Sequence, residues 1–159
     1  MGTISAEEQV KGELDRKTAI FEGTVLEIKQ PSQKTIMSTA DKVRVTFEVS
    51  RVWKGEVGQQ AEVYTAMSSA SCGIENFEVG TKYIVSAYKD SKPLETNICD
   101  LTKPLANARA ELAILGDGYA PMDQASNESG NLMVITLIVT ITAIIIGLFV
   151  WMIVKRPRV

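Results

Sequence analysis

The stretch KVRVTFEVSRVW, residues 42–53, decides the fold class because apolar and polar residues alternate along it. Val43, Val45, Phe47 and Val49 fall on one face of a strand, and the residues between them are polar or charged. This period of two is typical of a strand with one buried and one solvated face, as found in antiparallel sheets. We therefore predict a mainly β domain built around this strand.

Further strands are predicted on both sides of this stretch. Segments rich in β-forming residues are separated by turns that contain glycine, proline or polar residues. The additional strands are predicted at residues 18–29, 61–66, 81–88 and 94–99. Five short strands within residues 1–116 favour a five-stranded OB-type Greek-key barrel. A β-sandwich fits the same pattern and stays the alternative fold.

Two helices are predicted at the ends of this domain. Ser5 and Glu8 have the spacing of a capping box, which predicts a short helix that ends near Arg16. After the strands, Thr102 is a candidate helix cap, and apolar residues then recur at intervals of three and four until Gly116. The predicted domain is thus a β barrel with an N-terminal and a C-terminal helix.

Residues 132–154 read LMVITLIVTITAIIIGLFVWMIV and include no charged side chain. A helix of this length extends roughly 35 Å, which is enough to cross a bilayer core of about 30 Å. Trp151 lies near one end of the segment, where interfacial aromatic residues are common. We therefore predict that residues 132–154 form a single transmembrane helix and anchor the chain in the lipid bilayer.

The flanks of this segment predict its orientation. Three basic residues follow it directly: Lys155, Arg156 and Arg158. The residues just before it, QASNESGN, contain no lysine or arginine, and positive flanks stay in the cytoplasm. We expect a single-pass cell-membrane protein with the N-terminal domain outside. The predicted division is a domain at 1–116, a linker at 117–131, the span at 132–154 and a cytoplasmic tail at 155–159.

The amino-acid composition argues against several classes of function. The chain has 17 Lys and Arg, 19 Asp and Glu, two cysteines and no histidine. Residues 1–154 carry a formal net charge of −5, because 14 positive side chains face 19 negative ones there. The absence of histidine and of nucleophile or phosphate-loop motifs argues against an enzyme, a metal site or a cofactor. An acidic body argues against binding to nucleic acid.

Several stretches together resemble the netrin-like, tissue-inhibitor-of-metalloproteinases-like domains of bacterial surface proteins. They are AIFEGTV (19–25), VTFEVSRVWKG (45–55), SCGIENFEVGTKYIV (71–85) and ICDLTKPLANARAELAILG (98–116). The resemblance covers Ala19 to Gly116 and implies the OB-type barrel. It also implies that Ser69, Ala70, Ser71 and Cys72 form a loop that contacts a partner protein.

The resemblance changes the expected role of the two cysteines. By count alone, Cys72 and Cys99 would pair with each other. Members of this family instead carry an N-terminal Cys-x-Cys whose cysteines bond the two that match Cys72 and Cys99. This chain lacks the Cys-x-Cys and an apolar signal peptide. A start about 30 residues upstream, with a signal peptide, would explain both absences. We therefore predict that Cys72 and Cys99 are not bonded to each other.

The function that these features predict is a membrane-tethered extracellular protein-binding module. By resemblance alone, its partner would be a metalloprotease that it inhibits or regulates. The alternative is a surface module that binds the cell wall or a glycan without inhibitory activity.

Overall fold

The computed structural model describes residues 5–33, 36–89 and 93–123. The chain divides into two units, Met1–Asp123 and Gln124–Val159, and the description concerns the first. In the part of the chain that is described, no helix is long and apolar enough to cross a bilayer. The predicted span at 132–154 lies outside the described residues, as do four residues of its predicted membrane flank: Trp151, Lys155, Arg156 and Arg158.

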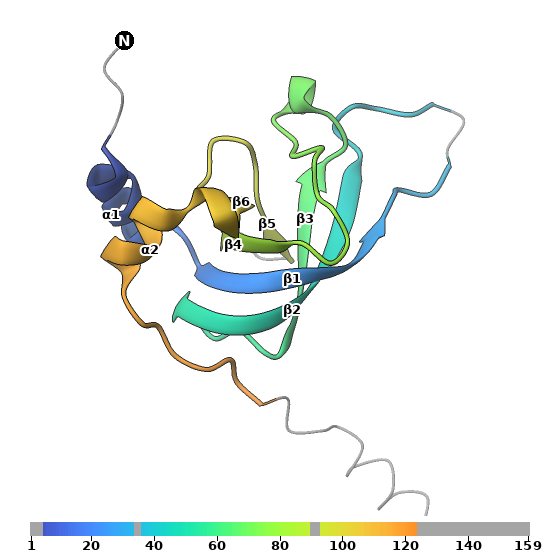
Figure 1. Cartoon of the computed structure of the whole chain (residues 1–159). Helices are drawn as coiled ribbons and strands as arrows, with labels where there is room; N and C mark the ends of the chain where they lie inside the picture. Colours follow the sequence, from blue (N-terminus) through green and yellow to red (C-terminus); the bar gives the residue numbers. More distant parts are fainter. Residues whose placement is uncertain (1–4, 34–35, 90–92, 124–159) are drawn as a thin grey trace, which may run out of the picture. The chain divides into compact units, whose positions relative to one another are not determined.

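A six-stranded, mostly antiparallel sheet forms the centre of the domain (Figure 1). Its strand order is β5-β3-β2-β1-β4-β6, and only the β3–β5 pair is parallel. The strands are β1 (Ala19–Lys29), β2 (Lys42–Lys54), β3 (Gln60–Ala66), β4 (Lys82–Ala87), β5 (Leu94–Glu95) and β6 (Lys103–Pro104). The predicted mainly β class is confirmed, and the short β6 is a strand that the sequence pattern did not predict.

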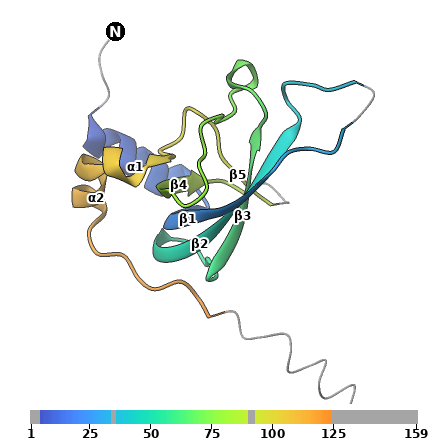
Figure 2. The ribbon, with the colours of Figure 1, turned by 45° about the vertical axis from the view of Figure 1, so that its right-hand side comes forward.

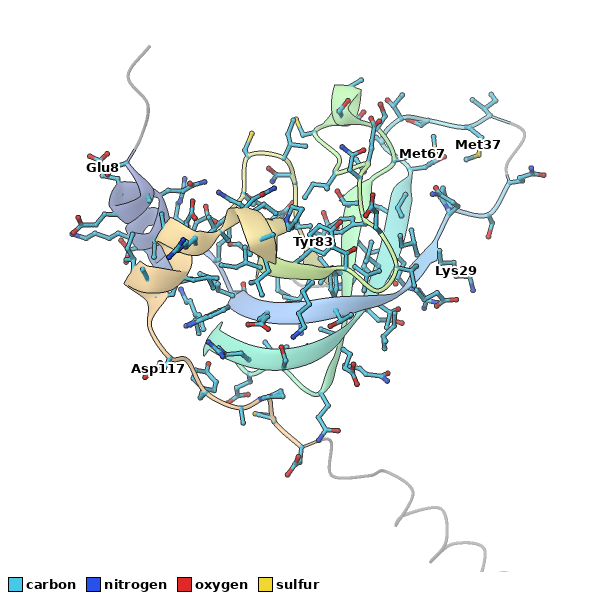
Figure 3. The ribbon with its side chains drawn as sticks, in the orientation of Figure 1. Glu8, Lys29, Met37, Met67, Tyr83 and Asp117 are labelled. Carbon is cyan, nitrogen blue, oxygen red and sulfur yellow. The ribbon has the colours of Figure 1, made fainter. Side chains whose placement is uncertain are left out.

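The alternation along β2 produces the main apolar core. The four apolar residues predicted to share a face are all buried in this core: Val43, Val45, Phe47 and Val49. The ring of Phe47 makes edge-to-face contacts with Phe21 at 5.8 Å and Phe77 at 5.7 Å between centroids. Figure 3 shows Tyr83 in the same interior. Aromatic side chains from three strands and a loop therefore fill the concave face of the sheet.

A second, smaller core lies between the sheet and two helices, α1 (Ala6–Arg16) and α2 (Arg109–Leu115). Its buried members are Val10, Ile20, Ile84, Leu101 and Ala108. Ile20 and Ile84 stand on the opposite face of their strands from the main core, so β1 and β4 are buried on both faces. Figures 1 and 2 both show α1 and α2 together at one end of the domain.

The structure contains both predicted helices, but only the first of them begins at the predicted cap. The capping box is confirmed, because the Ser5 side chain accepts a hydrogen bond from the Glu8 amide and the Glu8 carboxylate bonds back. The predicted cap at Thr102 is wrong. Its hydroxyl accepts from the amide of Ser86 at 3.0 Å and thereby completes the edge of β4. The chain then forms β6 and a 3-10 turn, η2 (Leu105–Asn107), before α2 begins.

The predicted fifth strand is also shorter than expected. Only Leu94 and Glu95 form β5, and the chain turns at Asn97–Asp100. The Asp100 carboxylate accepts a hydrogen bond from the Asn97 amide at 3.0 Å, which competes with strand pairing in the way short polar side chains often do. Cys99 therefore lies on a turn rather than on a strand.

Residues 117–123, the start of the predicted linker, return to the sheet. Tyr119 and Val52 exchange two backbone hydrogen bonds, at 2.7 and 2.8 Å. The indole N–H of Trp53 donates to the carbonyl of Gly116 at 2.9 Å. Further along, the side-chain amide of Gln59 donates to the Asp123 carboxylate at 2.8 Å. This segment is therefore fixed beside the turn between β2 and β3.

Candidate binding site at the Ser69–Cys72 loop

The predicted contact loop is a 3-10 turn, η1 (Ser69–Ser71), that directly follows β3. Ser68 caps it, because its side chain accepts from the amide of Ala70 at 3.3 Å. Cys72 ends it in the left-handed conformation, with φ of 61°. Figures 1 and 2 show η1 as a projection at the end of β3, away from the two helices. The side chains of Ser69, Ala70 and Cys72 are exposed.

Gly73 lets this loop fold back tightly against β3. A Cβ atom at this position would lie 2.0 Å from the carbonyl oxygen of Ala66, far inside contact distance. The amide of Gly73 donates to the Ser68 carbonyl at 2.9 Å, and the next amide, of Ile74, donates to the Thr65 hydroxyl at 3.0 Å. The loop is thus closed at its base by a close backbone contact and two hydrogen bonds.

Glu75 secures the outer side of the same loop. Its carboxylate accepts a hydrogen bond from the backbone amide of Ser69. This bond, with smaller contributions from the side chains of Ser69 and Ser68, lowers the pKa of Glu75 below its ordinary value. The fully exposed carboxylate is therefore charged at neutral pH while it orders the loop.

A second loop, residues 36–41, lies against the contact loop. The hydroxyls of Thr39 and Ser71 are 2.7 Å apart and share a hydrogen bond. Two backbone hydrogen bonds also join the loops: the Ser68 amide donates to the Thr39 carbonyl, and the Met67 amide donates to the Asp41 carbonyl. The two loops therefore form one hydrogen-bonded surface.

A third loop brings the two cysteines into the same region. The amide of Ile98 donates to the carbonyl of Cys72 at 3.1 Å, so the turn that carries Cys99 adjoins the contact loop. The Asn97 side chain accepts from the Cys99 amide at 2.8 Å, and Asp100 is paired with Lys17 of the segment after α1. Both cysteines are exposed and free of disulfides in this structure. The family resemblance had not implied that Cys72 and Cys99 lie near each other.

Exposed apolar side chains surround the contact loop. Ile36 is 84% exposed and Ile98 is 52% exposed, and Met37 is also exposed. Figure 3 shows Met37 and Met67 at the same end of the molecule. A hollow of about 230 Å³ lies beneath this surface, lined by Ile28, Gln30, Val43, Met67, Ile74, Glu75 and Phe77.

The arrangement offers few groups for chemistry. Among the described residues, no three His, Cys, Asp or Glu side chains are grouped closely enough to hold a metal ion. The polar groups at the contact loop are hydroxyls, one carboxylate and the exposed thiol of Cys72, and the Thr39–Ser71 hydroxyl pair and the Glu75 carboxylate hold the loop in place.

Sequence reasoning predicted that residues 69–72 form a contact loop but did not find the residues that hold this loop in place. Thr39 and Ile98 were not singled out, because each bonds to a residue in another loop that is distant in sequence. Glu75 was also missed, although its partner Ser69 belongs to the same loop. One signal was present in the sequence. Ser68 followed within a few residues by a glycine is typical of a capped turn that closes on itself.

Comparison with known proteins adds no assignment: no protein-family model matches the chain, and no curated protein matches it. The netrin-like resemblance therefore rests on the quoted stretches alone.

Proposed function

We propose that this chain is a membrane-tethered, extracellular protein-binding module whose central strands close into an OB-type barrel. Support for closure comes from β5, which pairs with β3 on one side. On the other side Glu95 exchanges two backbone hydrogen bonds with Tyr88, the residue that follows β4, at 2.9 and 3.0 Å. Since β4 also pairs with β1, these contacts return the sheet to its start, as closure requires.

The observation that carries the binding proposal is the joining of three loops into one exposed surface. Residues 36–41, 68–75 and 97–100 are connected by hydrogen bonds, yet their outward side chains are free of the core. Binding then requires little further ordering of these loops, and low ordering cost favours affinity. Loops held on a rigid sheet commonly carry function in this way.

A metalloprotease is the partner class that the resemblance suggests. The contact residues would be Ser69, Ala70, Ser71 and Cys72, of which all but the half-buried Ser71 are exposed. We propose inhibition or regulation of such an enzyme by surface contact, with no cofactor. The supporting features are the shape of the loop and the exposed apolar residues around it.

Asp123 lies at the other end of β3 from the contact loop. It is bonded to Gln59 just before β3, whereas the contact loop follows the last residue of β3. Seven residues of strand separate these points by roughly 20 Å. The residues around Asp123 therefore leave the contact loop uncovered.

Inhibition of purified zinc endopeptidases by the full-length chain in lipid nanodiscs tests this proposal. We expect slower peptide hydrolysis in at least one enzyme of a secreted panel. The variant Ala70→Arg should weaken inhibition at least about tenfold, since it places a charge and bulk in the contact loop. Asp15→Arg, on the exposed side of α1, is the matched control and should leave inhibition unchanged.

Two results would contradict the protease proposal. Hydrolysis could proceed at the same rate with and without the chain for every enzyme in the panel. The chain could instead sediment with purified cell-wall fragments and be released by soluble glycan, which would favour the wall-binding or glycan-binding alternative.

A further inference from the structure

We propose that Cys72 and Cys99 are an exchange site for low-molecular-weight disulfides, and that exchange closes an internal disulfide between the contact loop and the 97–100 turn. The two cysteines are 27 positions apart in sequence, and both are exposed and reduced. The hydrogen bond between the Ile98 amide and the Cys72 carbonyl places their loops together. This inference does not depend on the proposed protein-binding function.

The backbone geometry brings the pair close to bonding distance. The 3.1 Å N–H···O bond, with the standard bond lengths on either side of it, leaves the Cα atoms of Ile98 and Cys72 no more than about 7 Å apart, and the next Cα along the chain is about 3.8 Å further at most. The Cα atoms of Cys72 and Cys99 therefore lie within about 11 Å, and disulfides span about 4.4–6.8 Å. A shift of at most about 4 Å in one exposed turn is enough to bring the two Cα atoms into that range.

The conformation of Cys72 is a second, independent observation. It is the only non-glycine residue with positive φ among the described residues. Glycine or asparagine adopts this conformation at lower cost, and an exposed thiol contributes nothing to the core that would offset the difference. Strained positions of this kind are concentrated at functional sites, and here the group that the strain presents is a thiol.

The proposed reaction is two successive thiol–disulfide exchanges. One cysteine thiolate attacks glutathione disulfide, forms a mixed disulfide and releases one glutathione thiolate. The thiolate of the other cysteine then attacks the protein sulfur of that mixed disulfide and releases the second glutathione. The protein dithiol is oxidised and one glutathione disulfide is reduced to two glutathione thiolates, which take up from solvent the two protons that the cysteines released to it.

The test uses the reduced, full-length chain in detergent, incubated with glutathione disulfide and quenched with acid. Intact mass should fall by the mass of two hydrogens, no glutathione should be retained, and the chain should stay monomeric. A tryptic digest should join the Cys72 peptide to the Cys99 peptide, and dithiothreitol should separate them. The variants Cys72→Ser and Cys99→Ser should each retain one glutathione, because the second exchange lacks its nucleophile.

Three results would overturn the inference. The wild-type chain could carry two stable glutathione adducts, which would show that the cysteines do not reach each other. It could form a disulfide-linked dimer, or it could keep both thiols free while the single variants are modified.

Discussion

The two ends of this domain are held by different kinds of contact. At the helix end, buried side chains fix α1 and α2 to the sheet: the carboxylate of Glu13, 1% exposed, accepts from the Ser86 hydroxyl and the Leu101 amide. At the loop end, hydrogen bonds mostly involve the backbone, and the side chains of Ser69, Ala70 and Cys72 are exposed. The difference separates a side of the molecule that provides stability from one that is available for contact.

The largest expected effect comes from the core that both ends share. Phe47→Ala removes a fully buried ring that contacts Phe21 and Phe77, and it should lower the free energy of unfolding by about 3–5 kcal/mol. Urea denaturation followed by circular dichroism measures this change. Glu48→Ala, on the exposed face of the same strand, should stay within about 0.5 kcal/mol of wild type. Equal losses in both variants would contradict the assignment of the core.

Adding a single methyl group at Gly73 should destabilise the loop end. Gly73→Ala places a Cβ 2.0 Å from the Ala66 carbonyl, so the backbone must shift at a cost of about 1–3 kcal/mol. Hydrogen exchange should become faster at the amides of residues 69–74 and stay unchanged in α1. Gly12→Ala, where the nearest atom is 3.5 Å away, should be neutral or slightly stabilising. Unchanged exchange at the loop in Gly73→Ala would contradict this account.

The helix end should depend on the charge of one side chain. Glu13→Gln keeps the size of the side chain but removes its charge and leaves one acceptor oxygen where Glu13 uses two, one for Ser86 and Leu101 and one for Arg16, which should cost about 1–3 kcal/mol. Thermal or urea unfolding measures the loss. The exposed Asp15→Asn is the matched control and should be nearly neutral. If Glu13→Gln were as stable as the control, Glu13 would not hold the helix to the sheet.

The smallest expected effect is the pH dependence of the contact loop. The pKa of Glu75 is lowered by the Ser69 amide, so its contribution to loop order is present above the ordinary pKa and is lost as pH falls through the lower folded value. Nuclear magnetic resonance of the Glu75 carboxyl carbon should give a titration midpoint below the ordinary pKa of a glutamate. Glu75→Gln should speed exchange of the Ser69 amide at neutral pH. A midpoint at or above the ordinary value would contradict the proposed hydrogen bond.

The alternation of apolar and polar residues predicted the central strands and the core better than it predicted the edge strands of the sheet. The alternation along β2 correctly indicated which residues enter the core, because burial of one strand face is a local property of the sequence. The role of Thr102 depended on Ser86, sixteen positions earlier, and could not be deduced from local pattern. The contact loop was located through resemblance, whereas its ties to Thr39 and Ile98 depend on how the chain returns in space.

The central claim, an anchored domain whose loop end faces the outside, is tested most directly by labelling cysteines on intact cells. The chain has only Cys72 and Cys99, and both are exposed, so no cysteine needs to be introduced. After mild reduction, a membrane-impermeant maleimide should label the full-length chain on intact cells, and a Cys72→Ser, Cys99→Ser double variant should stay unlabelled. Labelling that occurs only after the cells are lysed would contradict the claim.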